Sequence, residues 1–392
     1  MWDPWGTGKT VIRSAYAILT DQPVANAISP LNANPPFTNP LVSTAAGLSM
    51  LNANTLAGAS SLAPNAINKG FKNPYVQSWN LNVERQMGTN LGLTVAYVGS
   101  KGTHLRVARN MNQVFFTGTT LQRPFSKVNL SSPITPGQAL GNINEVDSAA
   151  NSSYHALWVT LNKRISHGLQ FNTSYVFSRS IDNNSLSTNT IVVQNSLNIA
   201  NSRGLSDFDV RHRFVFGGFY ELPFRGNRLV EGWQLGIISQ AQSGNPLTVL
   251  TSVTGFTGVG TLRPDIVGSV SSTGDPNQWF SSLTAFSVPC ATPNPTTASQ
   301  LSTCHFGNLG RNSLTGPNFL NTDFSIVKNT KITERLKAQF RTEFFDFFNQ
   351  ANFGNPNLSV GNSRFGVISS TRTPTGDFGS SRQIQFALKL QF

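Results

Sequence analysis

The last eleven residues, RQIQFALKLQF, alternate strictly between apolar and polar side chains. A period of two is typical of a β-strand that has only one apolar face. The same pattern recurs upstream and predicts a first strand near residues 10–20 and four hairpins, at 78–97, 157–177, 209–242 and 319–345. Together with the terminal strand this gives about ten strands, each near the length that a tilted strand needs to cross a bilayer. The apolar residues of the terminal strand are Ile384, Phe386, Leu388, Leu390 and Phe392.

The connections between these strands alternate between short turns and long segments rich in Asn, Ser, Thr, Gly and Pro. Structureless loops longer than about 15 residues are uncommon in compact soluble domains. A transmembrane β-barrel, by contrast, has short periplasmic turns on one rim and long extracellular loops on the other. We therefore predict an all-β fold, an antiparallel transmembrane β-barrel segment in which residues 1–392 form one domain. The long segments lie near residues 21–74, 102–153, 181–208, 242–318 and 346–380.

Composition excludes several other classes of protein. Only 12% of the residues are charged, about half of the usual share in soluble domains, and polarity is carried by uncharged side chains. No stretch approaches the roughly 18 consecutive apolar residues of a membrane helix. The net charge of +12 comes from cations that are spread singly, so we expect no nucleic-acid partner. Alternation alone does not exclude a soluble β-sandwich or solenoid.

Motifs for catalysis and metal binding are weak. The string GTGKT at residues 6–10 has Asp3 where a phosphate-binding loop requires glycine, so we expect a turn into the first strand. No nucleophile elbow is present. The histidines form no pair with metal-ligand spacing; they are His104, His155, His167, His212 and His305. The sequence therefore predicts no enzyme activity, no metal site and no cofactor.

Two small groups of residues remain as site candidates. Alternation places Asp209, Arg211 and Arg213 on the face opposite Phe214, which in a barrel is the lumen. They form either a charged ladder that contacts a plug or substrate, or a cross-strand ion pair that fixes register. Cys290 and Cys304 fall in the longest loop, where a disulfide is one of two open possibilities.

Specific strings resemble the C-terminal barrel of TonB-dependent outer-membrane receptors, particularly the Oar-like group with a carboxypeptidase-regulatory-like N-terminal domain. They include WDPWGTGKTVIRSAYAIL, NPYVQSWNLNVERQMGTNLGLTVAYVGSKGTHL, DVRHRFVFGGFYELPF, ITERLKAQFRTEFFDFFNQANFG and the terminal RQIQFALKLQF. The resemblance implies a Gram-negative outer-membrane location and TonB-coupled uptake through a plugged barrel of about 22 strands. It also implies contact with outer-membrane lipid, lipopolysaccharide and the barrel assembly machinery, whose signal would be the terminal strand ending at Phe392.

The sequence also departs from that family. It has about ten strands, no plug, no TonB box and no signal peptide, so we expect it to be the C-terminal part of a larger barrel. Plug and TonB contacts would then require a missing N-terminal part. The long loops would bind the ligand, whose identity the sequence does not reveal. Two alternatives remain open: a self-contained ten-strand porin or adhesion barrel, and a soluble β protein that binds partners through its loops.

Overall fold

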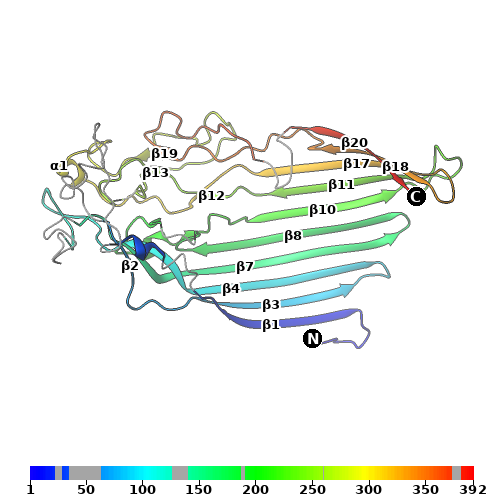
Figure 1. The fold of residues 1–392 in the computed structure, drawn as a ribbon, viewed down its shortest axis with the longest axis horizontal. Helices are drawn as coiled ribbons and strands as arrows, with labels where there is room; N and C mark the ends of the chain where they lie inside the picture. The colour runs from blue at the N-terminus through cyan, green and yellow to red at the C-terminus, as the bar shows by residue number, and fades with distance from the viewer. Residues whose placement is uncertain (23–28, 35–62, 126–139, 187–189, 259, 373–380) are drawn as a thin grey trace.

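The computed structural model describes residues 1–22, 29–34, 63–125, 140–186, 190–258, 260–372 and 381–392, and one antiparallel sheet dominates it (Figure 1). The ten long strands lie side by side in chain order, while β2 and β9 add to β7 and β8. Within the described residues β1 and β20 each pair on one side only, so the sheet remains open. The predicted all-β antiparallel fold is confirmed. The ten are β1 (Thr10–Thr20), β3 (Tyr75–Gln86), β4 (Leu91–Asn110), β7 (Asn144–Ser166), β8 (Leu169–Asp182), β10 (His212–Glu221), β11 (Trp233–Gln242), β17 (Phe319–Lys331), β18 (Lys337–Phe345) and β20 (Gln383–Gln391).

Short and long connections are sorted to opposite ends of the sheet. In Figure 1 the hairpin turns and both chain termini lie at the right, and the long connections lie at the left. The tightest turn joins β7 to β8 through His167 and Gly168, whose φ angles of 52° and 74° suit a two-residue hairpin. At Gly168 a Cβ atom would also come within 2.5 Å of the Glu221 carbonyl oxygen. Glycine therefore satisfies both the backbone angle and the close approach of β10.

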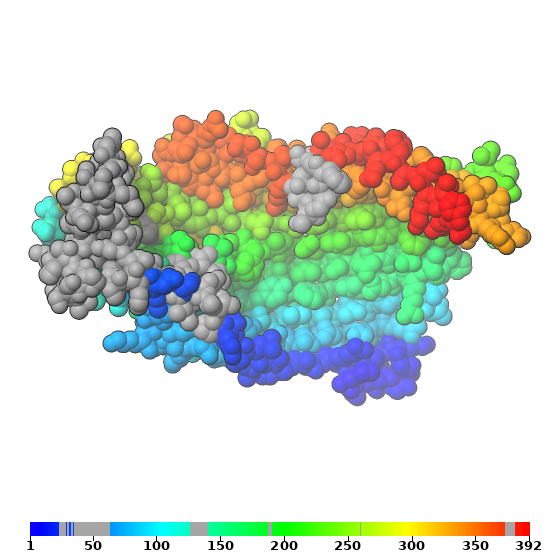
Figure 2. Space-filling view, viewed as in Figure 1, coloured from blue at the N-terminus to red at the C-terminus, as the bar shows by residue number. Residues whose placement is uncertain are grey.

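Strand register gives the sheet one apolar face and one polar face. Across four neighbouring strands, Leu81 lies opposite Tyr97, Tyr97 opposite Leu157, and Leu157 opposite Phe177. These four side chains are all more than 40% exposed. The other face carries pairs such as Asn162 with Asn172, and Figure 2 shows that the sheet is hollowed like a trough. A continuous exposed apolar face on a twisted antiparallel sheet is the arrangement that a lipid-facing barrel wall requires.

Two sequence-based boundaries need correction. The predicted loop at 102–153 is shorter, because β4 and β7 run on as a paired ribbon of 20 and 23 residues. Arg109 holds this extension together through ion pairs of 2.8 Å to both Glu145 and Asp147. In addition, the hairpin predicted at 209–242 has no short turn, because the connection between β10 and β11 covers residues 222–232. The ion pairs explain why the loop at 102–153 is shorter than predicted. They continue the strand pairing beyond the apolar stretch, and alternation of apolar residues cannot reveal ion pairs.

The long connections after β8, β11 and β18 pack together into what we call the loop cap, the described residues of 183–211, 243–318 and 346–372. Its core contains Leu247, Phe280, Phe286 and Phe365, each at most 8% exposed. Among the described residues no helix is long and apolar enough to cross a membrane. The small elements of the cap are η4 (Ile199–Ser202), β9 (Gly204–Leu205), β12 (Pro246–Leu247), β13 (Leu250–Thr251), β14 (Asp265–Ile266), β15 (Phe286–Ser287), α1 (Ala298–Leu301), β16 (Leu314–Thr315) and β19 (Ser359–Val360). Other small elements at the long-connection end are η2 (Ser29–Ala33), β2 (Asn65–Ile67), β5 (Phe115–Thr117) and β6 (Thr120–Gln122).

Candidate functional site in the loop cap

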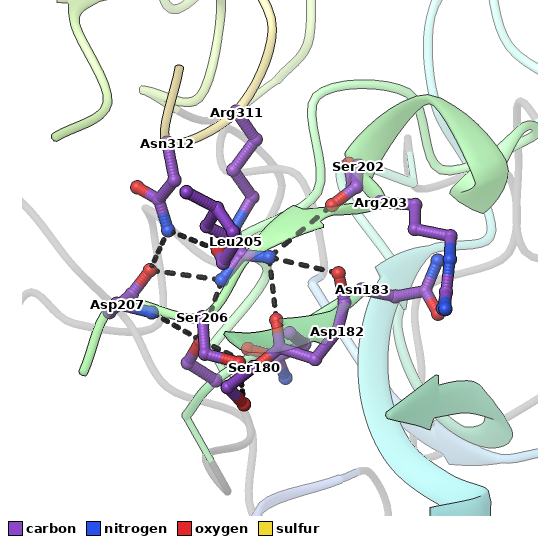
Figure 3. Close-up of polar contacts among 12 residues, drawn as sticks. Ser180, Asp182, Asn183, Ser202, Arg203, Leu205, Ser206, Asp207, Arg311 and Asn312 are labelled. Atoms are coloured by element: carbon purple, nitrogen blue, oxygen red, sulfur yellow. Dashed lines mark hydrogen bonds and ion pairs between the residues drawn. The ribbon is translucent and has the colours of Figure 1, made fainter. Parts of the chain in front are cut away.

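Arg311 joins its own segment of the loop cap to the end of β8 and to the cap segment that follows β8 through charged hydrogen bonds (Figure 3). Its Nη1 donates to Asp182 Oδ1 at the end of β8 over 2.6 Å, and its Nη2 donates to Asp207 Oδ1 over 2.9 Å. Nη2 also donates to Ser185 Oγ over 2.7 Å. Only 10% of the Arg311 side chain and 4% of the Asp182 side chain are exposed. A buried pair of this kind stabilises the cap only while both partners remain, because either charge alone would be strongly destabilising.

The next residue along the chain, Asn312, extends this network of hydrogen bonds. Its φ of 54° lies in the left-handed region, which asparagine tolerates better than most residues. The side-chain Nδ2 donates to the Leu205 carbonyl over 2.7 Å and to Asp207 Oδ1 over 2.6 Å. The backbone N–H of Asn312 donates to Thr248 Oγ1 over 2.9 Å. Arg311 and Asn312 therefore fix residues 205–207 against the segment after β12.

A cavity of about 350 Å³ opens beside this network. Its wall combines the polar side chains of Asp207 and Asn312 with the apolar side chains of Leu250 and Leu358, and Arg263 contributes a second cation. Segments after β8, β11 and β18 all contribute to the lining. A concave surface with a few convergent polar groups on an apolar wall is the usual form of a small-ligand site.

Arg263 is the least compensated charge in this wall. The residue is 5% exposed, and its Nη2 donates to the Asn201 carbonyl over 2.9 Å. Its Nε is buried without a hydrogen-bond partner among the described residues. Burial, and secondarily the nearby charge of Arg311, lower the pKa of Arg263 to about 10. The guanidinium therefore stays protonated at neutral pH.

The three residues of the predicted charge ladder lie near one another but do not form a single row. Asp209 precedes β10, is 4% exposed, and accepts a hydrogen bond from the Ser180 backbone N–H. Burial raises the pKa of Asp209. Arg213 lines the same pocket as Asp209, whereas the Arg211 guanidinium lies 5.8 Å from the centre of the Phe177 ring. Because Phe177 belongs to the apolar face, Arg211 turns away from the lumen side.

Cys290 and Cys304 are joined by a disulfide with a Cα–Cα distance of 4.0 Å. This bond ties α1 to the segment after β15. Nearby, His305 Nε2 lies 2.7 Å from Asp265 Oδ2. In the terminal strand, β20 runs from Gln383 to Gln391, and Phe392 follows it as an almost fully exposed side chain.

The site offers binding groups, and the part of the chain that is described contains no cluster of three or more metal ligands. Sequence reasoning missed Asp182, Arg263 and Arg311. Arg311 is 129 residues from Asp182 and 104 from Asp207, so no local spacing could have linked them. Their only sequence signal is that charged residues are scarce in these polar loops.

A family model and one solved structure agree with this architecture. Residues 1–385 match the family model described as an outer membrane β-barrel domain. The outer membrane transporter YddB from Escherichia coli is 9% identical, with a TM-score of 0.53 over 100% of this chain and 39% of that chain. The siderophore receptor PiuA from Acinetobacter baumannii is 10% identical, with a TM-score of 0.43 over 98% and 34%. This chain thus spans well under half of either structure, and no curated protein matches its sequence.

Proposed function

Since the chain belongs to the outer membrane β-barrel domain family, we propose that it is the membrane-embedded part of a TonB-coupled receptor whose loop cap captures a ligand for uptake. The chain is located in the outer membrane of a Gram-negative cell. Assignment to the Oar-like group, and to a larger receptor of which this is the C-terminal part, belongs to the same proposal. The assignment to the Oar-like group and to TonB coupling rests on the sequence strings that resemble TonB-dependent receptors.

One observation carries the receptor proposal: the long connections build a packed cap with its own core and cavity. Plain solvated loops would bury few apolar side chains, yet Val249 and Phe280 are at most 1% exposed. A passive porin needs loops only to shape its opening. A cap with a cavity at the extracellular rim instead fits selective capture.

The apolar face supports a second part of the proposal, contact with outer-membrane lipid. At its long-connection end, Lys101 and Arg179 follow the aromatic side chains of this face and are exposed. The Arg211 guanidinium lies on the same side, over Phe177. Cations just beyond an aromatic belt suit the phosphates of lipopolysaccharide. The terminal strand through Phe392 would engage the barrel assembly machinery, and the polar face would receive a plug if a further N-terminal part exists.

The test is to follow compounds that disappear from the medium of the bacterium that carries this gene. We expect at least one compound whose depletion requires both the gene and the proton motive force. Cells treated with an uncoupler, and cells that lack the gene, serve as the two controls. Gene-dependent depletion that persists with the uncoupler would contradict coupled uptake and favour the passive porin.

A further inference from the structure

The wall of the loop-cap cavity contains one buried guanidinium, that of Arg263, that has no carboxylate partner among the described residues. Arg311 has two carboxylate partners, Asp182 and Asp207. Arg263 lines the same cavity, and none of the described carboxylates lies within ion-pair distance of it. Of its three guanidinium nitrogens, Nη2 alone makes a hydrogen bond within the described residues, and that bond goes to a neutral carbonyl. A charge that is 95% buried normally has a compensating partner, because desolvation without one is costly.

Arg311 and the partly buried Arg109 follow that rule. Arg109, at the extension of β4, pairs with both Glu145 and Asp147. Arg263 differs because its side chain reaches the wall of a cavity rather than a packed interior. The missing countercharge would therefore come from a molecule that enters the cavity.

The remaining wall restricts the charge and shape of that molecule. Asp207 lines the cavity and its side chain is 47% exposed, so it presents a negative charge close to the entering group. A doubly charged phosphate would be repelled there, whereas a single carboxylate balances the one unpaired guanidinium. Leu250, Leu358 and Ile191 supply an apolar wall, which suits an aliphatic segment beside the carboxylate.

We propose that this cavity binds the carboxylate of a small aliphatic monocarboxylic acid through Arg263. The inference rests on the proposed function, because it names the chemical class of the ligand that the loop cap would capture. Arg263 acts as the anion-binding residue. Arg311 acts as a positioning residue, because its own hydrogen bonds are taken by Asp182, Asp207 and Ser185.

The experiment measures binding of hexanoate, hexanamide and hexyl phosphate to the full chain in lipid nanodiscs by saturation-transfer difference NMR. Nanodiscs without the protein serve as a control for partition of the three compounds into lipid. Hexanamide has nearly the shape of hexanoate but no charge, so we expect it to bind about tenfold or more weakly, the usual value of a charge-assisted hydrogen bond. Arg263→Gln should weaken hexanoate binding by a similar factor. Arg364→Gln, at an exposed position of the loop cap that is not part of this cavity wall, should leave it unchanged.

Equal binding of hexanoate and hexanamide to the unmodified chain would overturn the proposal, even if Arg263→Gln failed to fold. Tighter binding of hexyl phosphate than of hexanoate would overturn the assignment to a monocarboxylate. The uptake experiment is separate from both. If energised uptake is found but the charge preference is absent, this inference alone falls; if the preference is found without coupled uptake, the receptor proposal falls.

Discussion

Replacement of Arg311 by Met should lower the opening free energy of the loop cap by about 3–5 kcal/mol, the usual cost of leaving a buried charge without its partner. Asp182 is the carboxylate that would be stranded, since only 4% of its side chain is exposed. Asp207 would contribute little, because its side chain is 47% exposed and can be hydrated. Hydrogen exchange with mass spectrometry measures the opening free energy of the peptides that contain these two residues.

Arg13 provides the matched control for this prediction. Its ion pair with Glu84 spans 3.4 Å between side chains that are 51% and 38% exposed, so Arg13→Met should cost at most about 1 kcal/mol. Combining Arg311→Met with Asp182→Asn should recover part of the loss, because the buried charge is removed. An Arg311→Met effect no larger than that of Arg13→Met would refute the assignment of Arg311 as the residue that holds the cap together.

Three further perturbations test other parts of the structure. Replacing Cys290 and Cys304 together by Ser should lower the stability of the folded loop cap by about 3 kcal/mol, the chain-entropy value for a closed loop of about 15 residues. The replacement should also speed protease cleavage between these positions on intact cells. Unchanged cleavage would mean that the disulfide does not restrain this loop. Phe386→Arg, on the apolar face, should lower the free energy of unfolding of the membrane-inserted state by about 2–4 kcal/mol, as measured by urea unfolding. Gln385→Arg, on the polar face, should lower it by less. Equal decreases for the two variants would contradict the assignment of the faces. Because burial raises the pKa of Asp209, the contribution of this residue to the stability of the loop cap should fall as pH rises through that pKa. Asp209→Asn should remove this pH dependence from the opening free energy of the cap measured by hydrogen exchange.

The strands could be predicted from sequence because their determinants are local. Alternation over a few residues places Leu81, Tyr97 and Leu157 on one face, and closely spaced turns fix their register. The first strand illustrates this, since the expected span near residues 10–20 is the observed Thr10–Thr20. Alternation failed at the extension of β4 and β7, where ion pairs rather than apolar periodicity continue the pairing.

The loop cap and its cavity could not be predicted, because their contacts join distant parts of the chain. Leu247, Phe280 and Val360 share one core but lie in segments without any periodic pattern. The composition of these segments, rich in Asn, Ser, Thr, Gly and Pro, gives no sign of a packed core. The charge network is equally non-local, and Arg211, one residue of the expected ladder, packs on Phe177 outside the regular strand.

The central claim is that the sheet crosses the outer membrane with its apolar face against lipid, and the two neighbouring isoleucines of β11 test it most directly. Ile237 pairs with Phe324 on the apolar face, and Ile238 pairs with Asp323 on the polar face. Each is replaced by a single spin-labelled cysteine, since the two native cysteines are joined in a disulfide, and accessibility to oxygen and to a water-soluble nickel complex is compared in outer membranes. The account predicts high oxygen and low nickel accessibility at position 237 and the reverse preference at position 238. Equal preference at both positions, or the opposite assignment, would contradict it.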